Sequence, residues 1–274
     1  MKSFKNKVCV ITGGGSGIGR ALAKQLAEAG AKVAISDVNE KNLKETEALL
    51  GLASDHIHTQ VLDVSNRDDF EAYAIQLKDY FGGVDMIVNN AGVALAETVE
   101  KTSYEDFEWL MDINFWGVVY GTKAFLPLLK SSSEASLVNI SSIFGLAGIP
   151  TQGAYNASKF AVRGFTEALR LELKNTSVQP LSVHPGGIKT NIVRNGRMRW
   201  SISGGADKSA MERDFDKFTF TTPEQAAEVI LTAVKKKKNR VLIGADAHVY
   251  DWATRLLPRS YHHLIDTVIR PKLP

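Results

Sequence analysis

Short apolar segments alternate with helical patterns along the first two-thirds of this 274-residue chain, and this order does most to limit its fold. Uninterrupted apolar runs are typical of strands that are buried on both faces of a parallel sheet. The segments are residues 8–11, 33–36, 57–62, 86–88, 137–140 and 181–183. Because helical stretches separate them, we predict repeated strand–helix–strand units. The expected fold is a single-domain, Rossmann-like α/β structure with a doubly wound parallel sheet flanked by helices.

Three helical segments matter for the site. They are residues 19–29, 104–126 and 155–174. The third has the longest pattern, and its apolar residues are expected to cover one broad face. These residues are Phe160, Val162, Phe165, Ala168, Leu169 and Leu173.

The pattern changes after Pro185. Residues 187–222 are polar and interrupted by glycine, so we interpret them as a mobile loop beside the substrate, with one or two short helices. Thr222 is the expected N-cap of a helix that Pro223 opens, and residues 240–244 resemble a final edge strand. We therefore predict one domain over residues 1–250, with this substrate loop inside it.

Residues 251–274 extend beyond what the fold requires. Apolar residues recur there at helical spacing, namely Tyr261, Leu264, Ile265, Val268 and Ile269. We expect this extension to pack on the domain or on a partner subunit. Peripheral contact with a membrane surface is the alternative, because Arg255, Arg259, Arg270 and Lys272 accompany the apolar residues.

Composition excludes several classes of protein. Lys and Arg together number 33 against 30 for Asp and Glu, a balance that argues against a nucleic-acid partner. The only cysteine, Cys9, lies in an apolar run, which predicts a buried free thiol and a cytoplasmic location. Apolar stretches are too short to cross a bilayer. His56 and His58 lack the additional ligands of a zinc site, so we expect no metal.

A glycine-rich turn follows the first predicted strand. Its spacing, Gly13-x3-Gly17-x-Gly19, differs from G-x-G-x-x-G, and Arg20-Ala21 replaces the Lys and hydroxyl residue of an NTP-binding loop. Glycines let the backbone approach a pyrophosphate, and the following helix presents free N–H groups. The turn therefore predicts a dinucleotide site that includes Gly13, Gly15, Ser16, Gly17, Ile18 and Gly19.

Asp37 ends the second predicted strand, where an acidic residue meets an adenosine ribose in dinucleotide-binding folds. A carboxylate accepts hydrogen bonds from both ribose hydroxyls and repels a 2′-phosphate. Neither Ser16 nor Val38 offers that phosphate a basic partner. The expected cofactor is therefore NAD, in preference to NADP.

Tyr155 and Lys159 lie four residues apart on one predicted helix, so their side chains share a face. A nearby ammonium favours the phenolate, which suits an acid or base. Ser142 directly follows the strand 137–140, at the sheet edge where parallel strands line a ligand crevice. Asn114 lies in the segment 104–126.

Together these motifs resemble the short-chain dehydrogenase/reductase family over residues 5–190, and more loosely to Gly244. They are the turn from Thr12 to Gly19, Asp63-Val64, Asn89-Asn90-Ala91-Gly92, Asn114, Ser142, Tyr155-x3-Lys159, and Pro185-Gly186 with Thr190. The resemblance implies that Tyr155 exchanges a proton with the substrate oxygen and that Ser142 binds this oxygen. It also implies that Lys159 lowers the pKa of Tyr155 and binds the nicotinamide ribose, and that Asn114 holds a water of the proton relay.

The same resemblance implies further cofactor contacts. Asp63 and Val64 would recognise adenine, and Asn90 and Gly92 would line the cofactor. Pro185 and Gly186 form the turn that leads to Ile188 and Thr190, which would contact the nicotinamide amide. Gly187 is an additional glycine that leaves the path of this turn open. Family members form homodimers or homotetramers built partly on their long helices, which is the expectation here.

The resemblance implies hydride transfer between NAD and a secondary alcohol or ketone. Phe144, Ile149 and Ile192 would line a pocket for a bulky apolar substrate beside Ser142 and Tyr155, although core packing is the alternative. A second alternative is an NAD-binding sensor without turnover. A serine hydrolase using Ser142 and His184 is a third, disfavoured by the lack of G-x-S-x-G.

Overall fold

Seven parallel strands form the central sheet of the computed structural model, which describes residues 1–200, 205, 207, 212–213, 215 and 219–263. The strand order is β3-β2-β1-β4-β6-β7-β9. The strands are β1 (Val8–Thr12), β2 (Lys32–Asp37), β3 (Ile57–Val61), β4 (Met86–Asn89), β6 (Ala135–Ile140), β7 (Val178–Pro185) and β9 (Arg240–Ile243). The predicted parallel sheet is confirmed, and β9 lies at its edge beside β7, as expected.

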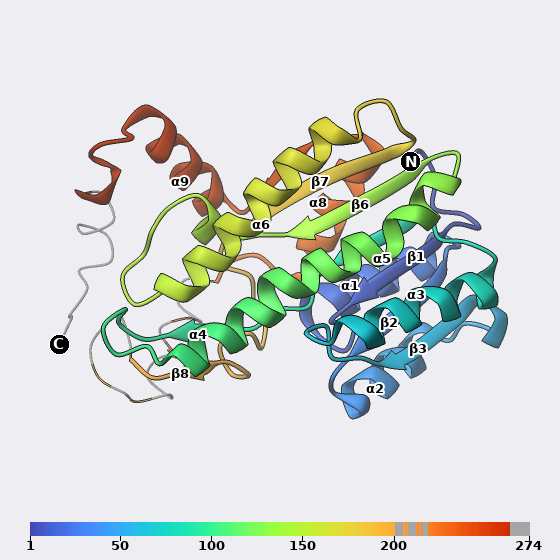
Figure 1. Cartoon of the computed structure of the whole chain (residues 1–274), viewed down its shortest axis with the longest axis horizontal. Coiled ribbons are helices and arrows are strands. Elements are labelled where there is room, and N and C mark those ends of the chain that lie inside the picture. Colours follow the sequence, from blue (N-terminus) through green and yellow to red (C-terminus); the bar gives the residue numbers. More distant parts are fainter. Residues whose placement is uncertain (201–204, 206, 208–211, 214, 216–218, 264–274) are drawn as a thin grey trace.

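Helices cover both faces of this sheet (Figure 1). One face carries α1 (Gly17–Glu28), α2 (Glu40–Leu50) and α8 (Pro223–Lys235), and the other carries α3 (Arg67–Phe81), α5 (Gly117–Ser131) and α6 (Gly153–Glu172). Helices on both faces of a parallel sheet are the doubly wound arrangement, so this prediction is confirmed.

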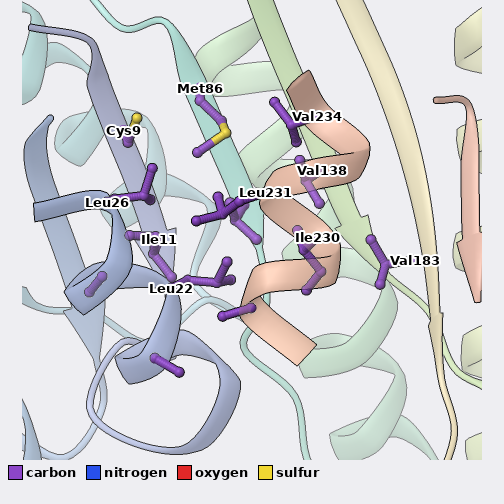
Figure 2. Packing of buried hydrophobic residues seen from close by; sticks show 14 of the residues in the cluster. Cys9, Ile11, Leu22, Leu26, Met86, Val138, Val183, Ile230, Leu231 and Val234 are labelled. Carbon is purple, nitrogen blue, oxygen red and sulfur yellow. The ribbon is translucent and has the colours of Figure 1, made fainter. Parts of the chain in front are cut away.

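The core on the first face lies between the sheet and the packed pair α1 and α8 (Figure 2). Leu22 and Leu26 of α1 meet Ile230 and Leu231 of α8 over the strands. Cys9 is fully buried among these residues as a free thiol, as predicted. Burial raises the pKa of this thiol, so Cys9 is a small core residue rather than a nucleophile.

Helix α8 begins where the sequence predicts. Thr222 is its N-cap, and the Thr222 hydroxyl accepts a hydrogen bond from the Gln225 amide at 3.2 Å. The Gln225 side chain in turn accepts one from the Thr222 amide at 2.9 Å. This reciprocal capping box satisfies N–H groups that the first helical turn leaves open.

The predicted helical segment 104–126 is confirmed, and the structure adds a detail within it. It is divided into α4 (Tyr104–Met111), a π-helical turn (Asp112–Trp116) and α5. A π-turn adds one residue to a helical turn and often marks a functional site. Here the extra residue changes the helical phase, and Asn114 becomes completely buried.

Phe160 was expected on the covered face of the long helix, and this expectation is wrong. Its side chain is 41% exposed, and Ala168 is also exposed. The buried face of α6 follows Tyr155, Lys159, Val162 and Leu169. Because Tyr155 and Lys159 face inward, they determine which side of α6 is buried, and Phe160 lies on the opposite, exposed side.

A second, two-stranded parallel sheet lies outside the main one. It pairs β5 (Leu95–Ala96) with β8 (Arg197–Met198), so part of the expected loop 187–222 is a strand. The short strand continues where the Arg199 amide donates to the Ala96 carbonyl oxygen at 2.8 Å. Other residues of this segment, including Gly204, lie outside the described residues.

The C-terminal part begins with α9 (Ala245–Leu256). After it, Tyr261 packs against Ala147 and Ile149, next to the end of β6. Four other residues of the proposed apolar pattern, Leu264, Ile265, Val268 and Ile269, lie outside the described residues, as do Arg270 and Lys272. Among the helices that the described residues form, none has the length and apolar character needed to cross a membrane.

Candidate active site

The glycine-rich turn links the end of β1 to the start of α1. Gly13 and Gly17 have φ angles of +65° and +50°, in the left-handed region that favours glycine. A Cβ on Gly19 would overlap the Gly13 carbonyl oxygen. Ser16 is the N-cap of α1 and its hydroxyl makes no capping hydrogen bond. The turn and the N-terminus of α1 therefore form a cradle built mainly of backbone groups, which fits a pyrophosphate.

Asp37 lies beside this cradle at the end of β2. Its Oδ2 accepts a hydrogen bond from the Gly15 amide, and its Oδ1 accepts one from the Asn39 amide, each at 2.9 Å. A Cβ on Gly15 would lie 2.8 Å from Asp37 Oδ2. The carboxylate is thus held next to the glycine turn, in a position that fits an adenosine ribose.

Asn90 holds the other side of the glycine turn. Its side-chain amide donates to the carbonyl oxygens of Thr12 and Gly13 at 2.9 and 3.2 Å. Its backbone amide donates to the Thr12 hydroxyl at 3.0 Å. Asn90 therefore supports the cradle from the end of β4 and fixes the shape of the glycine turn.

Asp63 and Val64 follow β3 at the same edge of the sheet. Asp63 Oδ1 accepts hydrogen bonds from the Ser65 amide and hydroxyl at 2.9 and 2.7 Å. Val64 is 7% exposed, and a Cβ on Gly117 would lie 2.9 Å from its Cγ2. The first contact orders the turn, and the second shows that α5 packs closely on Val64.

Tyr155, Ser142 and Lys159 converge beyond the end of β6, and all three side chains are largely buried. Lys159 Nζ donates to the Ile140 carbonyl oxygen at 3.1 Å and lies 5.6 Å from the centre of the Tyr155 ring. Phe144 meets the same ring edge-on, at a centroid distance of 5.8 Å. The structure therefore brings together the hydroxyl, phenol and ammonium groups that the sequence predicts.

The titration of this cluster differs from the sequence-based expectation. Burial raises the pKa of Tyr155 to about 12, although a hydrogen bond with Ser142 lowers it in part. Burial also lowers the pKa of Lys159 to about 8. Both shifts arise because burial favours the neutral form of each group. In the protein alone, Lys159 thus does not bring the phenol toward neutral pH, contrary to the expectation from charge alone.

Asn114 occupies the π-helical turn and faces the same cluster. Its Oδ1 accepts a hydrogen bond from the Val93 amide at 2.8 Å, and its Nδ2 donates to the Val93 carbonyl oxygen at 2.9 Å. Nδ2 also lies 3.3 Å from the Ser158 hydroxyl. A Cβ on Gly92 would lie 3.1 Å from Asn114 Oδ1 and 3.5 Å from Lys159 Nζ. Asn114 thus holds the segment that follows β4 close to Lys159.

His184 does not form a hydrolase pair with the Ser142 hydroxyl. Its Nδ1 lies 3.1 Å from the Ser142 carbonyl oxygen, and its Nε2 lies 3.0 Å from the Ser182 hydroxyl. Burial lowers the pKa of His184 to about 4, so the ring is neutral. The Nδ1 proton must then face the Ser142 carbonyl, and the Ser182 hydroxyl donates to Nε2. His184 supports the backbone at Ser142. It is not placed to act as the general base for the Ser142 hydroxyl, which argues against the serine hydrolase alternative.

The turn after β7 approaches the glycine cradle. A Cβ on Gly17 would lie 3.1 Å from Thr190 Cγ2, so Thr190 lies directly beside that turn. The Ile188 side chain is 5% exposed and packs in the core, which leaves its backbone available to a ligand. Pro185 and Gly186 connect β7 to this segment. These positions agree with a nicotinamide site at the end of β7.

Three residues expected to meet the substrate have different surroundings. Phe144 contacts Tyr155, whereas Ile149 is 5% exposed and packs with Ala147, Phe144 and Tyr250. Ile192 is half-buried. Packing with α9 and the following turn accounts for Ile149, so Phe144 is the one of these three residues with a ring contact to Tyr155.

Sequence reasoning missed two acidic residues near these loops. Asp106 of α4 is 8% exposed and binds Arg197 and Arg199, at 2.6 and 3.4 Å. Asp246 in the first turn of α9 accepts a hydrogen bond from the Gly187 amide at 2.7 Å. Each pair joins positions at least 59 residues apart, so no local spacing could have indicated it.

Three comparisons with known proteins agree with this geometry. Residues 7–199 match the family model described as short chain dehydrogenase. The chain is 44% identical to SadH of Mycobacterium tuberculosis over 97% of this chain and 96% of that protein. It is 40% identical to an NADP-dependent (R)-specific alcohol dehydrogenase of Lentilactobacillus kefiri, over 69% of this chain and 76% of that one.

Among solved structures, a short chain dehydrogenase/reductase from Burkholderia phymatum in complex with NAD superposes with a TM-score of 0.84 and 29% identity. The match covers 100% of this chain and 99% of that one. A levodione reductase superposes with a TM-score of 0.80 and 27% identity, over 90% and 98% of the two chains.

Proposed function

The chain belongs to the short-chain dehydrogenase family, and from this premise we propose that it transfers hydride between NAD(H) and a secondary alcohol or ketone, with Tyr155 as acid and base. The observation that carries this proposal is the buried convergence of Tyr155, Ser142 and Lys159 at the edge of the sheet where the glycine cradle also opens. A cradle for a dinucleotide and a proton-transferring phenol at one edge suit hydride transfer coupled to proton transfer.

Each catalytic side chain has a defined task in this proposal. When NAD is bound, it supplies the hydride acceptor at C4 of its nicotinamide ring. Ser142 donates a hydrogen bond to the substrate oxygen, and Tyr155 removes the hydroxyl proton during oxidation or returns it during reduction. The Lys159 ammonium offsets the negative charge that develops on Tyr155, while Asn114 keeps the segment after β4 beside this ammonium.

The preference for NAD over NADP is supported by Asp37. Its carboxylate is fixed by the amides of Gly15 and Asn39, so it would face the ribose without large rearrangement. The Burkholderia phymatum structure contains NAD, whereas the Lentilactobacillus kefiri relative is NADP-dependent. The local charge favours the first case, because a 2′-phosphate next to Asp37 would be repelled.

A bulky apolar substrate is supported by Phe144 beside Tyr155 and by the aromatic residue Trp109, which packs in the same cluster. We assign Ile192, which lies in the loop 187–222, to the same pocket. Ile149 packs against Phe144, so we propose that it affects the substrate indirectly. The proposed substrate is a small molecule. The proposed domain spans residues 1–250, and the extension 251–274 packs on this domain or on a partner subunit.

The proposed assembly is a homodimer or homotetramer in the cytoplasm. Exposed apolar side chains lie on α6 and directly before α5: Phe160 and Leu171 of α6 are 41% and 71% exposed, and Trp116 is 44% exposed. Burial of such a face between two copies is favourable. The molar mass in solution, measured by light scattering, checks this: a monomer would contradict it.

The test of the function is absorbance at the reduced-nicotinamide band. Purified protein is mixed with NAD or NADP and with secondary alcohols from small aliphatic to steroid-sized. We expect the rate of absorbance change to increase with the size of the alcohol and to be higher with NAD than with NADP. Cofactor binding without turnover on the whole panel and on the matching ketones would instead support a sensor.

A further inference from the structure

Asp246 lies outside every motif of the cofactor site, yet its carboxylate contacts the turn that follows β7. The Gly187 amide donates to Asp246 Oδ2 at 2.7 Å. The preceding Gly186 amide donates to the Ile243 carbonyl oxygen at 2.8 Å. The turn is thus held by one backbone group of β9 and by one carboxylate from α9.

The lack of space around this carboxylate explains why glycine is required at two nearby positions. A Cβ on Gly186 would overlap both carboxylate oxygens of Asp246. A Cβ on Gly244, whose φ is +95°, would also overlap Asp246 Oδ1. Two glycines, Gly186 and Gly244, therefore lie so close to Asp246 that a side chain at either position would overlap its carboxylate. This settles the path of the Pro185-Gly186-Gly187 turn that its sequence leaves open.

The location of Asp246 strengthens its hold on the turn. It lies in the first turn of α9, where the helix dipole and open N–H groups stabilise negative charge. A charged acceptor makes a stronger hydrogen bond to the Gly187 amide than a neutral one would. The contact therefore resists displacement of the turn.

We propose that Asp246 is a positioning residue for the nicotinamide end of the cofactor. This inference rests on the proposed function, because it acts through Ile188 and Thr190, which follow the restrained turn. Thr190 lies directly beside Gly17 of the glycine turn, and the Lys189 amide donates to the Thr221 carbonyl oxygen at 3.0 Å. Asp246 and Thr221 thus hold the segment from its two sides. The adenosine end, near Asp37, lies at another strand and does not depend on Asp246.

The test compares the dissociation constants of NAD and ADP-ribose, since ADP-ribose lacks only the nicotinamide. Asp246→Ala removes one charged hydrogen bond, so we expect NAD binding to weaken about tenfold and ADP-ribose binding to change less than twofold. Asp246→Asn keeps an acceptor oxygen and a similar size, so it should retain most of the NAD affinity and also guards against a folding defect in the Ala variant.

Glu224→Ala is the matched control, because Glu224 occupies the first turn of α8 in the same way and is exposed. It should leave both affinities unchanged. Equal weakening of NAD and ADP-ribose by Asp246→Ala, or no change in either, would overturn the positioning role while the wild-type protein still binds NAD. If the wild-type protein binds NAD no better than ADP-ribose, the nicotinamide makes no contact and the role is also overturned. A wild-type protein that binds neither ligand would overturn the proposed function, and this inference with it.

Discussion

The two sides of the crevice are built in different ways. On the cofactor side, backbone groups and glycines between β1 and α1 form the cradle, and Asp37 and Asn90 bind that backbone directly. On the substrate side, side chains far apart in the sequence hold the loops together. Arg197 of β8 binds Asp106 of α4 and lies 4.0 Å from the centre of the Trp109 ring. Figure 1 shows α4, β8 and α9 toward one end of the molecule.

This difference teaches where specificity can change. A cradle of backbone atoms tolerates few substitutions, because a new Cβ meets the main chain. Contacts between side chains, such as Asp106 with Arg197, can be replaced without altering the sheet. We therefore expect variants on the first side to change cofactor binding and variants on the second side to change substrate use.

The largest expected effect is at Tyr155, where the two sides meet. Tyr155→Phe removes the transferable proton and leaves a ring of similar size, so turnover should fall by about 1,000-fold. The dissociation constant for NAD should remain nearly unchanged. Steady-state kinetics and a cofactor titration check both statements, and near-normal turnover would reject Tyr155 as the acid and base.

Asp37→Ala tests the cofactor side and should have the next largest effect. Loss of hydrogen bonds to the ribose should weaken NAD binding by about 10- to 100-fold and relax discrimination against NADP. Asp37→Asn is the matched variant, because it retains an acceptor for the Gly15 amide but carries no charge. Titrations with both cofactors measure this, and an unchanged NAD-to-NADP ratio in both variants would remove the ribose assignment.

The pH dependence of alcohol oxidation should reflect the raised pKa of Tyr155, which is about 12 in the protein. Tyr155 must lose its proton to act as a base, and the deprotonated fraction grows with pH below this pKa. The value of kcat/KM for oxidation should therefore rise from pH 6 to pH 8, by up to about tenfold per unit, because Lys159, whose pKa burial lowers to about 8, still carries much of its charge in this range. A profile that falls over this range would contradict the role of Tyr155.

Asp106→Asn tests the substrate side and should have a smaller effect. Burial raises the pKa of this carboxyl, but hydrogen bonds from Arg197 and Arg199 outweigh it and hold the pKa below its usual range. Without this charge, β8 should be held less firmly beside α4. We expect KM for a bulky alcohol to rise about threefold to tenfold with little change in NAD affinity.

Glu105→Gln is the control for that variant, because its side chain lies on the same helix and is exposed. It should leave KM unchanged. If Asp106→Asn changed NAD affinity as much as KM, the two sides of the crevice would not be separate, and the comparison above would fail.

Local patterns in the sequence were enough to predict the elements that carry the proposed cofactor side. The strands, the glycine turn, Asp37 and the pair Tyr155 and Lys159 follow from apolar runs, glycine spacing and helical spacing. The contacts of Asn90 with Thr12 and Gly13, which join residues 78 and 77 positions apart, do not follow from such patterns. The exposure of Phe160 could not be predicted in this way. Its exposure depends on the inward-facing polar pair, which outweighs the apolar pattern around it.

Contacts between distant segments could not be predicted. Asp246 and Gly187 are 59 residues apart, and Asp106 and Arg197 are 91 residues apart, so only the fold brings them together. The π-helical turn that buries Asn114 also has no clear sequence signal, because it adds one residue to an otherwise regular helical pattern. The raised pKa of Tyr155 depends on burial, and burial cannot be deduced from the spacing of Tyr155 and Lys159.

The most direct test of the account follows a deuterium atom. A secondary alcohol carrying deuterium on its carbinol carbon is incubated with the protein and NAD, and the reduced cofactor is analysed by mass spectrometry. The account predicts deuterium on the nicotinamide ring with the wild-type protein and almost none with Tyr155→Phe, which still binds NAD. Alcohol oxidation that leaves the cofactor free of deuterium would contradict direct hydride transfer at this site.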